Sequence, residues 1–315
     1  MMFYSAIDEA LCDYDQAIKL DPNFAKAYAN RGATYANLQR YNEALRDYSR
    51  AIELDPNFVK VYSSRGNIYR KLHRYDEALH DYKWAIELDR NDAHAHVGRG
   101  NIYAALQRYD EALWDHDQAI ELDPNFALAY YYRGTTYQAL QRYDEALRDY
   151  NRAIELDSNY APAYSNRGNT YADLQRYDEA LRDYDQAIAL NPNYAQAYFN
   201  LGALLANTGQ VRESLPYFEK AALLGLPQAT QAIIQIRQAL GVAPTPQIDP
   251  TQQAFEAFQQ AGSVVEMQQA VAQFPLLAGA DFITAIEQTI AQQIPPQLQP
   301  AFQQRLAWLR QITNS

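Results

Sequence analysis

Glycine recurs in this chain at a fixed interval, and that interval constrains the fold more than any other feature. Alanine repeats in the same register, twelve and nineteen residues after each glycine, except that Ser214 takes one of these places. A period of this length is typical of a solenoid, in which each unit packs only against its neighbours. The six glycines that stand 34 residues apart are Gly32, Gly66, Gly100, Gly134, Gly168 and Gly202.

The apolar residues inside one unit follow a helical period of three and four residues, which predicts two amphipathic helices. In the first unit they are Tyr28, Tyr35, Leu38, Ala44, Leu45, Tyr48, Ala51 and Ile52. Acidic residues such as Asp110 and Glu111 begin the second helix, where the helix dipole favours negative charge. Segments such as 54–57, Leu-Asp-Pro-Asn, then end it, because proline cannot continue a helix.

In these features the chain resembles the tetratricopeptide-repeat family, whose unit has an aromatic residue, Gly, Tyr, Ala, a second aromatic residue, Ala and Pro at fixed places. The first unit supplies Tyr28, Gly32, Tyr35, Ala44, Tyr48, Ala51 and Pro56. The resemblance implies an all-α fold, a right-handed superhelical solenoid of helix-turn-helix repeats. Arg90, Ser158 and Leu226 replace the proline, and His96 and His116 replace both aromatics of repeat 3, so packing there is expected to differ.

Six repeats, with positions numbered from 1 to 34, cover residues 25–228 in the ranges 25–58, 59–92, 93–126, 127–160, 161–194 and 195–228. Residues 1–24 match only the second helix of a unit, so one apolar face lacks its partner helix. Either the chain is a fragment of a longer array, or residues 1–3 and another subunit cover that face through self-association. We expect Ile7, Leu11 and Ile18 to be more exposed than their counterparts in complete repeats.

The chain after the repeats changes in composition. We predict a capping helix over 229–240, a proline-containing linker over 241–250 and a small helical module over 251–315. The module loosely resembles small helical modules that follow repeat arrays in cyanobacterial-type signalling proteins. Its expected core is Phe255, Phe258, Val265, Phe274, Phe282, Ile286, Leu306 and Leu309.

The composition narrows the class of protein. The formal net charge is −11, which disfavours nucleic acid and anionic membranes as partners, because binding to phosphates requires Lys and Arg. An RNA-binding helical repeat is opposed on the same ground. The single cysteine, Cys12, fits a reducing compartment, and residues 1–12 do not resemble a signal peptide. We expect a cytoplasmic protein without membrane insertion.

The sequence predicts no enzyme, no catalytic residue, no cofactor and no metal site. It contains neither a Gly-rich phosphate loop nor a Gly-x-Ser-x-Gly or His-Glu-x-x-His motif. His94 and His96 are two residues apart and diverge on a helix, while His96 and His116 occupy packing positions. Acidic residues recur in every repeat, whereas a catalytic pair occurs once.

Arginine at position 7 and aspartate at position 23 recur together in five repeats. Repeat 6 loses both, with Leu201 and Tyr217 in their places. The joint loss predicts an internal Arg–Asp ladder, in which each arginine is expected to pair with the aspartate of the preceding repeat. The alternative is a row of arginines that bind a ligand. The residues are Arg31, Arg65, Arg99, Arg133 and Arg167, and Asp47, Asp81, Asp115, Asp149 and Asp183.

The family resemblance also implies a concave groove at positions 2, 5, 6, 9, 12 and 13 of the first helices. Cations gather at these positions in repeats 1 and 2, and amides and aromatics follow in later repeats. The residues assigned to partner binding are Lys26, Asn30, Lys60, Asn67, Arg70, Lys71, Asn101, Tyr131, Tyr132, Asn166, Asn169, Phe199 and Asn200. The carboxylate clamp of some family members is not carried over, because position 6 never holds Arg.

The sequence therefore predicts a non-catalytic scaffold or adaptor that binds an acidic segment of a partner protein or peptide in the groove. An interaction domain cut from a larger signalling or enzyme chain is the alternative. On the convex side, Trp84 and Trp114 stand where other repeats place mainly Arg or Gln, and they form a second contact surface if both are exposed.

Overall fold

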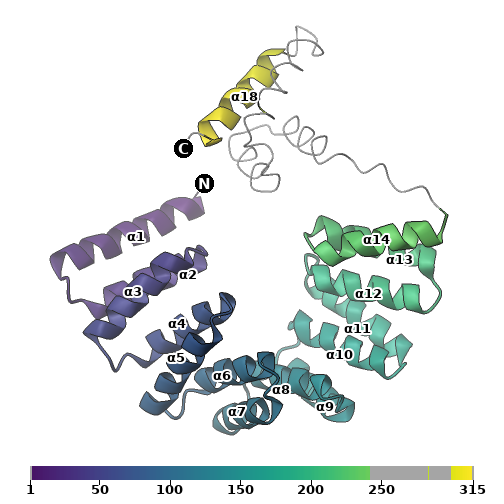
Figure 1. Cartoon of the computed structure of the whole chain (residues 1–315), viewed down its shortest axis with the longest axis horizontal. Helices are drawn as coiled ribbons and strands as arrows, with labels where there is room; N and C mark the ends of the chain where they lie inside the picture. Colours follow the sequence, from purple (N-terminus) through teal and green to yellow (C-terminus); the bar gives the residue numbers. More distant parts are fainter. Residues whose placement is uncertain (1, 242–282, 284–298, 314–315) are drawn as a thin grey trace. The chain divides into compact units, whose positions relative to one another are not determined.

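The structure is a computed structural model that describes residues 2–241, 283 and 299–313. Its regular elements over these residues are α-helices (Figure 1). The helices are α1 (Met2–Leu20), α2 (Ala25–Asn37), α3 (Tyr41–Leu54), α4 (Val59–Lys71), α5 (Tyr75–Leu88), α6 (Ala93–Ala105), α7 (Tyr109–Leu122), α8 (Ala127–Ala139), α9 (Tyr143–Leu156), α10 (Ala161–Asp173), α11 (Tyr177–Leu190), α12 (Ala195–Asn207), α13 (Val211–Leu223), α14 (Pro227–Ala239) and α18 (Gln299–Thr313).

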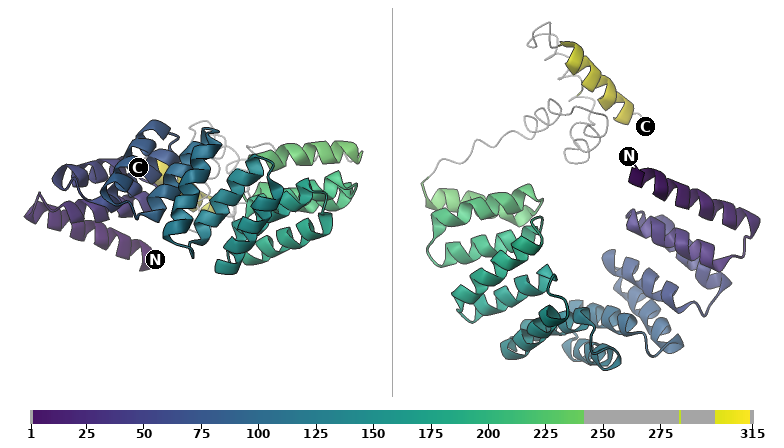
Figure 2. Two further views of the ribbon diagram at one scale, coloured as in Figure 1. Left: turned by 90° about the horizontal axis from the view of Figure 1, so that it is seen from below. Right: turned by 180° about the vertical axis from the view of Figure 1, so that it is seen from behind.

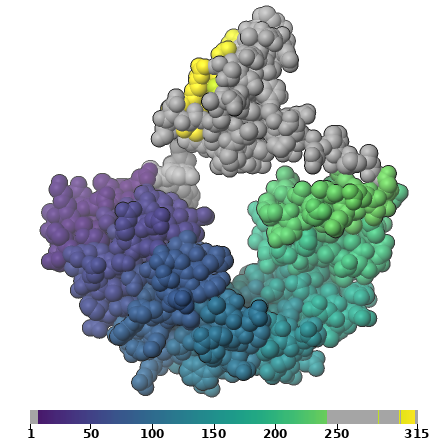
Figure 3. Space-filling model, viewed as in Figure 1, coloured from purple at the N-terminus to yellow at the C-terminus, as the bar shows by residue number. Residues whose placement is uncertain are grey.

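Each repeat is a helix pair, such as α2 with α3, and consecutive pairs pack side by side. The first helices also contact one another along the row, as α4 contacts α6 and α6 contacts α8. In Figure 1 the row curves, with α6 on its inner side and α7 on its outer side. The two further views show the same pairing of helices (Figure 2), and the space-filling view shows neighbouring repeats in continuous contact (Figure 3). The predicted α-solenoid is confirmed.

Small residues at fixed registers allow the two helices of a repeat to approach closely. A Cβ atom on Gly32 would lie 3.0 Å from the ring of Tyr48. Ala44 and Ala51 of the second helix are fully buried. The glycine and alanine periods of the sequence are therefore packing positions, because a larger side chain at either would push the helices apart.

The turn inside each repeat contains a residue with left-handed backbone. Gln39 has φ 59°, and the corresponding residue of repeat 6 is Gly209 with φ 87°. The amide of Arg40 donates to the carbonyl of Tyr35 at 2.9 Å, which closes the end of α2 in the geometry of a Schellman motif. This conformation favours glycine, so the glutamines and His73 are held there by the turn.

The turn between repeats has the same hydrogen bond whether or not it contains proline. In repeat 1 the Asp55 carboxylate accepts a hydrogen bond from the amide of Asn57 at 3.1 Å. Asp89 and Asp157 make the same bond where Arg90 and Ser158 replace proline. The expected difference in packing at these two turns is therefore corrected, because the Asp side chain fixes the turn.

The predicted exposure of the N-terminal helix is found at other residues. Ile7, Leu11 and Ile18 are half-buried, as their counterparts in repeat 1 are. The difference appears at Ala10 and Ala17, which are half-buried where the corresponding Ala44 and Ala51 are fully buried. The face of α1 that lacks a partner helix is therefore the small-residue face.

The chain divides into two compact units, Met1–Thr230 and Gln231–Ser315, with the boundary inside α14. Ala229 of α14 is fully buried. Most of the linker 241–250 and six expected core residues of the C-terminal module lie outside the described residues. These six are Phe255, Phe258, Val265, Phe274, Phe282 and Ile286. Within α18, Leu306 and Leu309 are buried as predicted.

Candidate partner-binding groove

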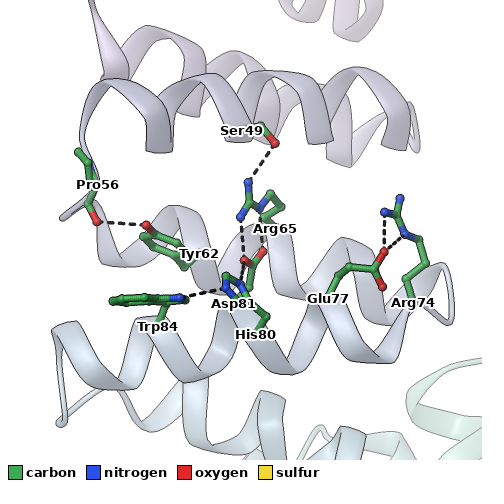
Figure 4. Close-up of polar contacts among 9 residues, drawn as sticks. All are labelled: Ser49, Pro56, Tyr62, Arg65, Arg74, Glu77, His80, Asp81 and Trp84. Carbon is green, nitrogen blue, oxygen red and sulfur yellow. Dashed lines mark hydrogen bonds and ion pairs between the residues drawn. The ribbon is translucent and has the colours of Figure 1, made fainter.

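The predicted Arg–Asp ladder exists, and its partner is the aspartate of the same repeat. Nε and Nη2 of Arg65 donate to the two carboxylate oxygens of Asp81 at 2.7 and 2.8 Å (Figure 4). The same two-bond contact recurs in repeats 1, 3, 4 and 5. The expectation of a partner in the preceding repeat is wrong for the aspartate, because packing aims the guanidinium at the second helix of its own repeat.

The third arm of four of these arginines reaches the preceding repeat unit. Nη1 of Arg65 donates to Ser49 at 3.0 Å, and Nη1 of Arg133 donates to Asp117 at 2.7 Å. Hydrogen bonds to Asp47, above all, raise the pKa of Arg31 further beyond its ordinary value. These arginines are engaged within the protein, so the alternative of a ligand-binding row is not supported.

The cations assigned to the groove differ from the ladder arginines. Lys26, Lys60 and Lys71 are exposed and Arg70 is half-buried. Across the part of the chain that the structure describes, none of the four forms an ion pair. The Lys71 ammonium lies 5.7 Å from the ring centroid of Tyr41. These four charges remain available to a ligand.

One acidic residue near the groove was missed by the sequence reasoning. Asp92 is the last residue of repeat 2 and caps α6, since its Oδ1 accepts from the amide of Ala95 at 3.1 Å. Its Oδ2 accepts from the hydroxyl of Ser63 at 3.1 Å. Asp followed by Ala at a helix start is a capping signal that could have been found. Because both oxygens of Asp92 are engaged, we expect it to compete weakly for the groove cations.

The side-chain oxygens of three groove asparagines contact other side chains of the protein. The Tyr82 hydroxyl donates to Oδ1 of Asn67 at 2.9 Å, and Tyr184 donates to Asn169 at 2.8 Å. In repeat 3, Nε2 of His116 lies 3.2 Å from Oδ1 of Asn101. Each Oδ1 contacts the second helix of its own repeat, so the amide Nδ2 is the group that can face a ligand. The assignment of these asparagines to partner binding stays a prediction.

The two tyrosines of repeat 4 lie in different surroundings. Tyr131 packs edge-on against Tyr160, with ring centroids 5.0 Å apart, and accepts a hydrogen bond from Asn166 at 3.1 Å. Burial raises the pKa of Tyr131. Tyr132 stacks on His116 at 6.3 Å between centroids and lines a hollow of the groove. Tyr131 is thus mainly a structural residue, and Tyr132 is the aromatic that faces the groove.

The remaining predicted residues lie along the same first helices. Asn30 of α2 is exposed. Phe199 packs edge-on against Phe218 at 5.4 Å between centroids. Asn200 donates to Ser165 at 3.3 Å and accepts from Gln196 at 2.7 Å. These residues lie on first helices, where the family pattern places them, and several of their side chains have partners within the protein. Their part in partner binding stays a prediction.

The convex tryptophans are exposed, as the sequence predicts: Trp84 is 43% exposed and Trp114 is 54% exposed. Each also has a local partner. Trp84 Nε1 donates to His80 Nε2 at 3.0 Å, and the Arg99 guanidinium lies 5.9 Å from the Trp114 ring centroid. They sit on different helices, α5 and α7, so their exposure alone defines no joint site.

Two histidines of repeat 3, His96 and His116, pack within the core as predicted, whereas His94 is exposed. His96 and His116 are 4% and 0% exposed. Burial lowers the pKa of His116 to about 4, so its ring is neutral at pH 7. Over the described ranges, no three His, Cys, Asp or Glu side chains gather as metal ligands would. None of the helices there combines the length and the apolar run that crossing a bilayer requires.

A row of helix pairs, each packed against the next, defines the class of α-helical repeat proteins. Profiles described as TPR repeat match residues 6–39, 100–141 and 168–209. Profiles described as tetratricopeptide repeat match residues 25–58, 59–92, 127–160, 149–182 and 195–224. The chain therefore belongs to the tetratricopeptide-repeat family, whose repeats serve as protein-interaction scaffolds and are typically non-catalytic.

Solved structures share the fold at low sequence identity. The APC/C hetero-tetramer Cut9-Hcn1 superposes with a TM-score of 0.66 at 16% identity, over 73% of this chain and 46% of that chain. A tetratricopeptide repeat protein from Parabacteroides merdae superposes with a TM-score of 0.64 at 20% identity, over 75% of this chain and 94% of that chain. This chain thus spans under half of the Cut9-Hcn1 chain. Among curated proteins none matches its sequence.

Proposed function

We propose that this chain is a non-catalytic adaptor that binds an acidic segment of a partner protein in the groove formed by its first helices. One observation carries the proposal. The ladder arginines are each paired with an aspartate of the fold, whereas Lys26, Lys60, Arg70 and Lys71 form no ion pair with a described residue. In a chain of net charge −11, a local set of free cations favours a negatively charged ligand.

The proposal is tested with the Lys60→Glu/Lys71→Glu double variant. A fluorescein-labelled peptide rich in Asp and Glu serves as the acidic segment, and stopped-flow fluorescence measures its association rate at several salt concentrations. We expect the variant to associate at least tenfold more slowly at low salt and with a weaker salt dependence, because exposed charges act mainly on encounter.

The matched control is the Lys83→Glu/Lys220→Glu double variant, which changes the net charge equally at positions outside the groove. Its association rate should stay within about twofold of the parent. Thermal unfolding of both variants checks that the fold is kept, since surface substitutions usually change stability by no more than about 0.5 kcal/mol. Equal rates for the groove variant and the parent at low salt would refute the proposal.

Two further assignments stay proposals. The first is the division of the chain into a partial repeat (1–24), six repeats (25–228), a capping helix (229–240), a linker (241–250) and a C-terminal module (251–315). Limited proteolysis tests this division, since cuts are expected in the linker. Cys12 is exposed and unpaired, in keeping with a reducing cytoplasmic compartment. Self-association through α1 is an open proposal that sedimentation of the intact chain can test.

A further inference from the structure

Two hollows in the groove occupy the same place in different repeats. The first has a volume of about 320 Å³ and the second about 430 Å³. The walls of the first include Arg70, Asn101, Tyr132 and Thr135. The walls of the second include the residues two units further along, Gln138, Asn169, Asn200 and Ala203. Each hollow spans three consecutive first helices, so the solenoid generates both by the same packing.

The first hollow carries a positive charge. Its Arg70 has a buried Nε that makes no hydrogen bond with any described residue. The guanidinium lies near the Tyr82 hydroxyl, where its charge opposes the burial that raises the pKa of Tyr82 to about 12. The Tyr82 side chain also hydrogen-bonds this guanidinium, but the phenol is neutral. A carboxylate entering the hollow therefore gains an ion pair with Arg70 that no described residue supplies.

The second hollow carries a negative charge. Asp173 lines it, at the position that Ala105 holds in the first hollow. Asp173 is the one acidic residue at the six groove positions of all six repeats. Its neighbour Gln138 donates to it at 3.4 Å, which is at the long end for a hydrogen bond. The Asp173 carboxylate is exposed and can accept from a cation.

We propose that the groove binds a dipolar segment of the partner protein, with an acidic side chain at Arg70 and a Lys or Arg side chain at Asp173. This inference rests on the groove binding proposed above and adds the chemistry of the segment. Charge complementarity at both ends fixes the direction in which the segment lies, because the reversed orientation brings like charges together in both hollows.

The spacing of the two charges follows from helix packing. Neighbouring first helices contact one another along the row, and packed helices lie about 8–10 Å apart. Arg70 lies on α4 and Asp173 on α10, three first helices further along the row. Three such steps span roughly 27 Å, which an extended chain covers in about eight residues at about 3.3 Å each. The partner segment should carry its acidic and basic residues about eight positions apart.

The test is a selection of phage-displayed random 16-residue peptides against the full chain. The parent should enrich peptides with an acid and a base about eight positions apart in one constant order. The R70E/D173K double variant should enrich peptides in which that order is reversed. Circular dichroism and a thermal melt confirm that the variant folds. If it does not fold, Arg70→Gln and Asp173→Asn replace it, and each should weaken one selected peptide about tenfold.

A control variant and three outcomes separate this inference from the proposed function. Arg74→Gln, an exposed arginine outside the groove, should leave the affinity unchanged. Enriched peptides that are acidic only, and insensitive to Asp173→Asn, would overturn the dipolar segment and keep the acidic-segment groove. Enriched peptides that bind the Lys60→Glu/Lys71→Glu variant as well as the parent would overturn both. If the parent self-associates and Arg70→Glu abolishes this self-association, a second copy of the chain occupies the groove. That result would overturn the inference of a separate partner.

Discussion

In repeat 5, residues 161–194, the aromatic position of the second helix holds Tyr184, whose hydroxyl donates to Asn169 at 2.8 Å. In repeat 3, residues 93–126, that position holds His116, which faces Asn101 through Nε2 at 3.2 Å. The other ring nitrogen of His116 is buried and finds no partner among the described residues. The two repeats thus place different polar side chains at the same position of the repeat. The histidine in repeat 3 leaves one buried ring nitrogen without a hydrogen bond to the described part of the chain, and a tyrosine at this position has no such atom.

The Arg–Asp contacts of the two repeats differ as well. In repeat 5, Arg167 bonds Asp183 and also Asn151 of the preceding repeat at 2.6 Å. In repeat 3, Asp115 is the hydrogen-bond partner of Arg99 among the described residues, because Lys83 stands where repeat 5 has the partner Asn151. His96 lies 2.8 Å from the same Asp115 carboxylate. More of the polar network of repeat 3 therefore depends on a single aspartate.

The largest expected effect comes from removing that aspartate's charge. Asp115→Asn should lower the free energy of unfolding by about 3 kcal/mol, because it removes the buried counter-charge of the half-buried Arg99 guanidinium. The matched change Asp183→Asn should cost less, since Arg167 keeps its bond to Asn151. Urea denaturation of both variants measures the two losses. Equal losses would show that the bond from Arg167 to Asn151 does not contribute to stability once the aspartate charge is removed.

A smaller loss is expected where Gly98 of repeat 3 packs against the Tyr82 ring of repeat 2. Repeat 3 holds Gly98 where repeat 5 holds Asn166. A Cβ atom on Gly98 would lie 2.9 Å from Cδ1 of the buried Tyr82 ring and nearer still to Cε1. Gly98→Ala should therefore destabilise the protein by about 2 kcal/mol despite the better helix propensity of alanine.

The control for that contact is Gly66→Ala, whose added Cβ would lie 3.2 Å from the Tyr82 ring. It should cost less than Gly98→Ala in the same urea titration. If Gly98→Ala were neutral, the Tyr82 ring would be free to move, and the close approach of repeats 2 and 3 would not limit the sequence at this position.

The smallest effect at neutral pH is expected from exchanging the aromatic residues of the two repeats. His116→Tyr should raise the free energy of unfolding by about 1 kcal/mol at pH 7, because it removes a buried unpaired nitrogen and restores a phenol–amide bond. Tyr184→His should have the opposite sign. Thermal and urea unfolding at pH 7 measure both.

The pH dependence of stability gives a second test of the exchange between His116 and Tyr184. Burial lowers the pKa of His116 from 6.5 to about 4 in the folded protein, so the unfolded chain binds the proton more tightly. The stability present above pH 6.5 is therefore lost as the pH falls toward 4, with a slope of up to about 1.4 kcal/mol per pH unit. His116→Tyr should reduce the slope and Tyr184→His should increase it. An unchanged slope in both variants would contradict the buried neutral histidine.

The sequence predicts the solenoid well because its signals are local or involve adjacent helices. Gly32 and Ala44 contact within one helix pair, so a fixed period is enough to identify them. The groove is predicted less well, since Asn67 and Tyr131 stand at surface positions of the family pattern and still bond within the protein. A side chain fifteen residues away, Tyr82, decides what the oxygen of Asn67 does, and the pattern of one helix does not contain that information.

By itself, the sequence determined the 34-residue period, the helix pairs, the small-residue packing positions and the joint presence of Arg and Asp. Only the tertiary structure decided which aspartate each arginine binds: Arg65 takes Asp81, sixteen residues ahead, and not Asp47, eighteen residues back. It also decided that Arg70 and Asp173 line equivalent hollows. The physical reason is that the period fixes which residues share a helix face, while the angle and distance at which neighbouring helices pack fix which side chains meet.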